Sequence, residues 1–112
     1  MTFWTPYGAA DNASFSVDQA DIGAQKYAEH CAVCHGSDMR GIHLSPPLVG
    51  ERFNQSWRGK PVSALAFHVQ RMPVAAPNSL SAETYTNLLA FILKATGLPP
   101  GKALPNGQAK LD

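Results

Sequence analysis

The 112-residue chain has no long hydrophobic run, and only 15% of its residues are charged. Its longest unbroken apolar stretch, Leu88 to Leu93, falls far short of the ~20 residues that a transmembrane helix needs. The net charge of +1 gives no bulk attraction to nucleic acid. The opening letters, MTFWTPYGAADNASF, lack the basic leader and apolar segment of an intact export signal. We therefore expect a small globular domain with a thin core and no transmembrane segment.

The few charges are unevenly distributed. Residues 1–39 carry a net charge of −4 and residues 40–71 a net charge of +4. The basic residues of the second stretch are Arg40, Arg52, Arg58, Lys60 and Arg71. Solvated surface is the ordinary explanation of such runs, and docking to a partner of opposite charge is the alternative.

The first residues show no sustained hydrophobic period. Residues 1–17 contain Pro6 and Gly8 and are interpreted as an N-terminal arm or linker. Residues 18–112 are interpreted as one domain. Aromatic residues are unusual in a disordered tail, so we expect those of the arm to pack on the domain or on a partner; they are Trp4, Tyr7 and Phe15.

Hydrophobic periodicity predicts helices and gives no stretch that alternates as a β-strand does. The first helix is expected to begin at Asp18, as its N-cap, and to run to about Cys31. Ala20, Gly23 and Tyr27 fall on one face. A glycine inside a helix costs about 1 kcal/mol relative to alanine. Gly23 therefore indicates that another backbone approaches closely at this point.

Two further helices are expected. One covers residues 61–70. The other begins after Ser81, which is a suitable N-cap, and ends near Gly97. Residues 36–59 contain four glycines and a Pro-Pro pair and are expected to form a long loop with at most one short helical turn. Loops of that length in small domains usually serve function.

Both cysteines of the protein lie in the stretch CAVCHG, as Cys31 and Cys34, with His35 next. A thioredoxin-type redox pair would stand beside a strand, and the chain has no strand pattern. A structural zinc site needs four ligands. The remaining histidines form no second pair at finger-like spacing; they are His30, His43 and His68.

The pattern C-x-x-C-H is the attachment site of a c-type haem, and this chemistry explains every position. Two thiols one helical turn apart reach the two vinyl groups on one porphyrin edge, and the imidazole of His35 then binds the iron. We expect one covalent haem, held through Cys31 and Cys34. Its large apolar surface would also complete a core that the chain alone fills poorly.

The second iron ligand is expected to be Met72. It lies far downstream of His35, in a proline-fixed loop, so the chain can reach the opposite face of the porphyrin. Met39 is too close to His35 to do so and is interpreted as a loop or packing residue. His43 and His68 are the competing ligands. Histidine with methionine fills both axial positions, raises the reduction potential and leaves one-electron transfer as the function.

His35 also needs an acceptor for its other ring N–H, since a metal-bound imidazole usually donates a hydrogen bond. The segment SPPLVG offers backbone carbonyls. We expect the carbonyl of Pro46 to be the acceptor, and Pro47 is the alternative.

From about Asp21 to Leu104 the sequence resembles class I cytochromes c. The resemblance rests on Gly23 and Tyr27 before C-x-x-C-H, and on a set of downstream residues: Pro46, Leu48, Gly50, Phe53, Trp57, Gly59, Met72, Pro73 and Phe91. It implies an all-α class I cytochrome c fold, with three to five helices wrapped around one covalent haem. It also implies that Gly23 and Tyr27 meet Phe91 where the first and last helices cross.

The same resemblance implies that Trp57 lines the haem and reaches a propionate, with Arg58 or Arg52 neutralising it. An ordinary core tryptophan is the alternative. The tail GLPPGKALP is similar to that of the cytochrome domains of PQQ-dependent alcohol dehydrogenases. We therefore expect either a separate carrier or a domain of such an enzyme, and not an enzyme by itself.

In that interpretation the partners are redox proteins, with a PQQ-dependent dehydrogenase as a possible donor and a terminal oxidase or another cytochrome as acceptor. The resemblance also implies a periplasmic location, with an export signal upstream. The alternative function is that of a haem enzyme or gas sensor in which Met72 is labile or not bound to iron.

Overall fold

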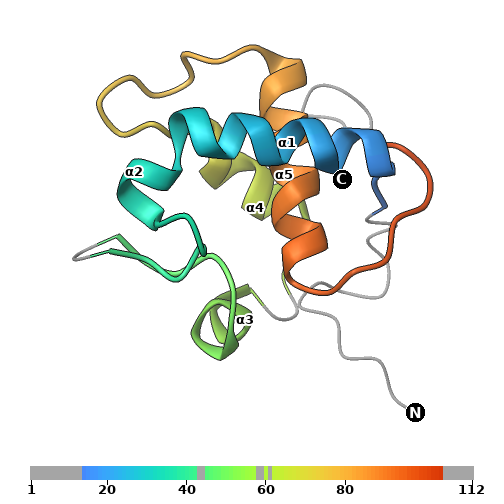
Figure 1. The fold of residues 1–112 in the computed structure, drawn as a ribbon, viewed down its shortest axis with the longest axis horizontal. Helices are drawn as coiled ribbons and strands as arrows, with labels where there is room; N and C mark the ends of the chain where they lie inside the picture. Colours follow the sequence, from blue (N-terminus) through green and yellow to red (C-terminus); the bar gives the residue numbers. More distant parts are fainter. Residues whose placement is uncertain (1–13, 43–44, 58–59, 61, 105–112) are drawn as a thin grey trace.

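The computed structural model describes residues 14–42, 45–57, 60 and 62–104. Within these ranges the protein has no β-strand, which confirms the predicted all-α class. The helices are α1 (Val17–His30), α2 (Ala32–His35), α3 (Glu51–Trp57), α4 (Val62–Gln70) and α5 (Ala82–Ala95). Figure 1 shows α1 crossing α5, with α2 continuing from the end of α1 and α3 standing apart from this pair. No helix in the described ranges is long and apolar enough to cross a bilayer.

The first helix begins earlier than predicted. Its N-cap is Ser16, not Asp18: the Ser16 hydroxyl accepts from the Gln19 amide N–H at 3.1 Å, and the Gln19 side chain accepts from the Ser16 amide at 3.0 Å. This reciprocal capping box satisfies two amides that a helix start leaves free. Asp18 instead lies in the first turn, where its charge favours the positive end of the helix dipole.

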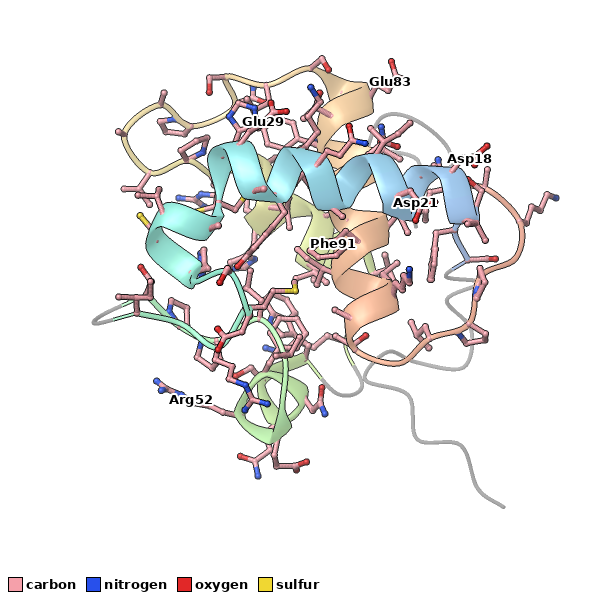
Figure 2. The ribbon with its side chains drawn as sticks, viewed as in Figure 1. Asp18, Asp21, Glu29, Arg52, Glu83 and Phe91 are labelled. Atoms are coloured by element: carbon pink, nitrogen blue, oxygen red, sulfur yellow. The ribbon has the colours of Figure 1, made fainter. Side chains whose placement is uncertain are left out.

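The crossing of α1 and α5 is as tight as Gly23 indicated. A Cβ placed on Gly23 would overlap the carbonyl oxygen of Asn87 and lie 2.9 Å from the Cβ of Phe91. One turn further along α1, the rings of Tyr27 and Phe91 pack with their centroids 5.4 Å apart. The predicted contact of Gly23 and Tyr27 with Phe91 is therefore present, and Figure 2 shows Phe91 between the two helices.

Helix α5 supplies most of the core. Ser81 caps it as predicted, accepting from the Thr84 amide at 3.1 Å. The residues from Tyr85 to Leu93 are buried except for Phe91, which is half-buried. An interior helix that is buried on most sides is expected where a small domain packs its other elements around it.

The segments before α1 and after α5 are joined to each other. Phe15 is buried in the core, and its carbonyl accepts from the Gly101 amide at 2.7 Å. The Gln19 side chain binds both the amide and the carbonyl of Leu104, each at 2.9 Å. The end of the predicted arm thus packs on the domain, whereas Trp4 and Tyr7 lie outside the described residues.

The middle of the chain has more helix than predicted. Helix α4 matches the expectation, with Val62, Leu65 and Ala66 buried. The expected loop at 36–59 contains α3, which is seven residues long rather than a single turn. Phe53 is buried and packs against Trp57 at 6.3 Å between ring centroids. Because these aromatic residues are four positions apart, they pack on one face of the helix and stabilise it. The glycine-rich segments on both sides made this pattern hard to recognise in the sequence.

We expect Gly23→Ala to lower the free energy of unfolding by about 2 to 3 kcal/mol. The new methyl group would overlap the α5 backbone, which cannot move aside by a change of rotamer as a side chain can. Urea unfolding followed by circular dichroism would measure the loss. The matched control is Gln25→Ala, on an exposed position of α1, which should stay within about 0.5 kcal/mol of the parent protein. Equal effects of the two substitutions would contradict the tight crossing.

Candidate functional site

The stretch Cys31–His35 forms a turn of helix directly after α1. Cys31 ends α1 and begins α2, and its carbonyl accepts from the amides of Cys34 at 3.1 Å and His35 at 2.9 Å. Both cysteines are free; Cys31 is half-buried and Cys34 is exposed. The two thiols therefore stand one helical turn apart, with His35 at the end of the same turn.

Two hydrogen bonds fix the chain immediately after His35. The buried hydroxyl of Tyr27 donates to the Gly36 carbonyl at 2.6 Å. The Gly41 amide donates to the His35 carbonyl at 2.7 Å. The backbone at His35 and Gly36 is thus held to α1 and to the following loop.

The imidazole itself is held by the Pro46 carbonyl, 2.8 Å from His35 Nδ1. A carbonyl can only accept, so Nδ1 carries the proton, and in the neutral ring Nε2 keeps a free lone pair. This is the arrangement in which an outer partner orients a histidine for a metal. Sequence reasoning anticipated this contact, with Pro47 as its alternative.

Gly41 allows the Pro46 carbonyl to approach. Its φ is +89°, and a Cβ there would lie 2.5 Å from the Ser45 oxygen and 3.1 Å from the Pro46 carbonyl carbon. A side chain at this position would therefore push away the residue that receives the His35 hydrogen bond. Sequence reasoning missed Gly41, since only the folded loop brings it against Pro46.

The alternative chemistries for the cysteine pair find no support in the site. Burial, and secondarily the charge of Cys34, raise the pKa of Cys31 to about 11. A disulfide-exchange cysteine needs a lowered pKa, because the thiolate is the nucleophile. For a zinc site, no three His, Cys, Asp or Glu side chains of the described residues lie together in a way that could hold a metal ion.

Met72 follows α4 and is half-buried. Its amide donates to the Val69 carbonyl at 3.1 Å, and its carbonyl accepts from the Tyr85 hydroxyl at 2.7 Å. The structure therefore ties Met72 to α4 and α5, whereas Cys31 and His35 are tied to α1. Met39 is buried in the core, as a packing residue would be.

Trp57 is half-buried in an aromatic group between α3 and α4. The His68 ring meets it edge-on with centroids 5.0 Å apart, and the Lys60 ammonium lies 5.3 Å from its centroid. His68 is exposed, as expected. Arg52 is exposed on α3. The predicted propionate partner Arg58 and the competing ligand His43 lie outside the described residues.

Asn54 was also missed by sequence reasoning. Of the residues that the structure describes, it alone has a buried side-chain polar atom, Oδ1, without a hydrogen-bond partner. It lies three residues before Trp57, on the same side of α3. Buried polar atoms are normally satisfied, and an amide oxygen can be satisfied only by a hydrogen-bond donor.

The described residues therefore fit a covalent haem: two free thiols on one helical turn and an imidazole with Nε2 available. An all-α fold with this turn at the end of its first helix defines a c-type cytochrome domain. The sequence matches the family model described as cytochrome c oxidase, cbb3-type, subunit III over residues 18–92, and the chain belongs to that family. The family implies a covalently bound haem c and electron transfer.

Two known proteins show the similarity. The chain is 33% identical over 79 residues to the thiosulfate dehydrogenase of Allochromatium vinosum, covering 63% of this chain and 29% of that protein. The crystal structure of the sulfane dehydrogenase SoxCD from Paracoccus pantotrophus superposes with a TM-score of 0.59 at 23% identity, covering 79% of this chain and 53% of that chain. The second similarity supports the fold.

The chain thus spans less than a third of the curated relative and about half of the solved chain that it matches. Both relatives are named as dehydrogenases of sulfur compounds, and neither is a PQQ-dependent alcohol dehydrogenase. The expectation drawn from the tail GLPPGKALP therefore gains no support from these two proteins.

A pair of glycine substitutions tests the support of His35. Gly50 has φ +92°, and nothing lies within 4 Å of the point where an added methyl group would stand, so Gly50→Ala should cost only the backbone strain, about 1 to 2 kcal/mol. Gly41→Ala has the same strain and also displaces Pro46, and should cost about 1 to 3 kcal/mol more in the free energy of unfolding. Urea titration of both variants would measure the difference, and equal losses would contradict the role of Gly41.

Proposed function

We propose that this domain transfers single electrons through one c-type haem held by Cys31 and Cys34, with His35 and Met72 as the iron ligands. The hydrogen bond from His35 Nδ1 to Pro46 is the observation that carries the proposal. It fixes the tautomer that a metal-binding histidine needs, in a chain whose two cysteines precede that histidine at haem-attachment spacing. The haem, when bound, supplies reversible one-electron chemistry.

The residues around the haem have separate tasks in this proposal. Cys31 and Cys34 anchor it covalently, and Pro46 orients His35. Met72 supplies a thioether, a soft ligand that favours the reduced iron and raises the potential. Trp57 and Arg58 are proposed to contact the haem propionates. With both axial positions filled, no site is left for a substrate, so electron transfer is favoured over oxygen or peroxide chemistry.

The partners are proposed to be redox proteins, and the location to be the periplasm. A dehydrogenase is proposed as the donor, and the named relatives make one acting on sulfur compounds a stronger candidate than a PQQ-dependent enzyme. A terminal oxidase or another cytochrome is proposed as the acceptor. The chain would serve either as a separate carrier or as the cytochrome domain of a larger enzyme.

Visible spectroscopy of the haem-loaded protein tests the ligands. We expect a low-spin spectrum with a methionine-to-iron charge-transfer band, and haem that stays with the protein in acidified acetone. Met72→Ala should abolish the band, lower the reduction potential and produce a high-spin or water-ligated spectrum, because the thioether is lost.

Met39→Leu is the matched control, since Met39 packs in the core and should leave the band in place. A parent protein that is high-spin would favour the haem enzyme or gas sensor instead. A colourless product from a host that attaches haem would overturn the proposal.

The charge distribution supports an acidic docking partner. Asp18, Asp21 and Glu29 lie along α1, whereas Arg52 lies on α3 at the other side of the molecule (Figure 2). The described basic residues of the stretch 40–71 are all exposed: Arg40, Arg52, Lys60 and Arg71. A surface of one sign draws in a partner of the opposite sign and raises the association rate.

Reaction with small oxidants would measure this steering. We expect oxidation by anionic hexacyanoferrate(III) to slow about tenfold when ionic strength rises from about 0.01 to about 1 M, as screening shortens from about 30 Å to about 3 Å. Oxidation by cationic tris(phenanthroline)cobalt(III) should not slow. Arg52→Gln should weaken the salt dependence for the anion more than Lys94→Gln, since Lys94 lies beside Asp21 at 4.0 Å on the acidic side. A flat response to salt would refute the steering.

A further inference from the structure

A single buried hydroxyl holds both ends of the loop that carries Met72. Tyr85 lies in the first turn of α5 and is 1% exposed. Its hydroxyl donates to the Met72 carbonyl at 2.7 Å and accepts from the Leu80 amide at 3.2 Å. The donor and an acceptor position of the phenol are thus both used, as burial of a hydroxyl requires.

The loop between these two contacts has little else to fix it. Residues 74–79 are all exposed, so their side chains contribute little core packing. Two backbone bonds also hold the loop, from the Ala76 amide to the Pro73 carbonyl at 2.9 Å and from the Asn78 amide to the Gln70 carbonyl at 2.8 Å. Figure 1 shows this segment leaving α4 and returning to the start of α5 as a wide arch. The Tyr85 hydroxyl therefore connects Met72 to α5, in addition to the bond from the Met72 amide to the Val69 carbonyl on α4.

Tyr85 stands on a helix whose own position is fixed. Helix α5 meets α1 at Gly23 and at the Tyr27–Phe91 ring pair, and α1 leads directly into Cys31. A continuous path of tight contacts thus connects the cysteine turn, α1, α5 and the Met72 backbone. Displacing the Met72 carbonyl from α5 requires its hydrogen bond to Tyr85 to break.

A phenylalanine would fill the same space as Tyr85 without making either hydrogen bond. Leu80 and Tyr85 hold the two positions of a hydrophobic staple on either side of Ser81, and Leu80 packs against the core cluster that contains Tyr85. Packing alone would therefore accept phenylalanine. The hydroxyl adds the specific connection to Met72, and its effect can be separated from packing by removing one oxygen atom.

We propose that Tyr85 is a positioning residue for Met72: its hydroxyl restrains the Met72 backbone and so keeps the thioether on the iron. This inference rests on the proposed function, in which Met72 is an iron ligand. In this proposal Tyr85 controls how readily the Met72 thioether dissociates from the iron. It thereby controls how easily external ligands can bind the iron.

Competition with imidazole tests this inference in the oxidised, haem-loaded protein. Tyr85→Phe should increase the apparent affinity for imidazole about fivefold relative to the parent protein, the factor that corresponds to about 1 kcal/mol for one net hydrogen bond. The methionine-to-iron band should also disappear on heating well before the helical circular dichroism is lost. Both readouts report ligand release rather than unfolding.

Thr86→Val is the matched comparison, because it removes a buried hydroxyl that donates to the Ala82 carbonyl within α5 at 2.9 Å, and not to the Met72 loop. We expect a similar loss of global stability with an imidazole affinity close to that of the parent. If the two variants bind imidazole alike, Tyr85 has only a structural role and the inference is overturned. A parent protein without a methionine-to-iron band would overturn the Met72 assignment itself, so the two failures are distinguishable.

Discussion

The contact of α1 with α5 at Gly23 is the constraint on which the rest of the structure depends. A small domain has few long-range contacts to spare, and this one places the Asn87 carbonyl where any side chain on Gly23 would stand. Because α1 continues into the Cys31–His35 turn and Tyr85 of α5 binds the Met72 carbonyl, the crossing sets where this turn lies relative to Met72, the proposed second ligand. Stability and function therefore depend on the same few contacts.

Around this crossing, the site is built mainly from backbone groups. Tyr27 binds the Gly36 carbonyl, Tyr85 binds the Met72 carbonyl, and His35 binds the Pro46 carbonyl. Carbonyls are present whatever the side chain, so the sequence there is constrained mostly by glycine and proline, which shape the path of the chain. Such fixed supports suit an electron carrier, whose ligands should move little between the two oxidation states.

The sequence predicted the parts of this structure that repeat with a helical period. Ala20, Gly23 and Tyr27 indicated the buried face of α1, and Ser81 indicated the start of α5. The local errors also have a physical cause. Ser16 with Gln19 is a complete capping box, which outweighs a single acidic residue at Asp18. At most one turn was predicted where α3 lies, because glycine and proline residues on both sides obscured its short aromatic pattern.

The remaining features could not be read from the sequence because they depend on contacts between distant residues. The sequence favoured Pro46 as the acceptor but kept Pro47 open, because the register of this loop depends on the close approach at Gly41. In the sequence Tyr85 is one more apolar position of α5, and only the structure shows that its hydroxyl binds the Met72 carbonyl. In the sequence Asn54 is an ordinary surface amide, and only the structure shows that its oxygen is buried. In each case the role of the residue depends on its surroundings in the folded protein, and no local sequence pattern identifies those surroundings.

The division between buried and exposed residues bears on what distinguishes this domain from its relatives. The buried contacts serve needs that any haem domain of this fold shares: a fixed histidine, an anchored porphyrin and a rigid pair of helices. The exposed residues meet no such need. Arg40 and Arg71 are exposed, and we expect their substitution to leave the core unchanged. Partner choice can therefore change without altering the buried contacts that fix the cysteine turn.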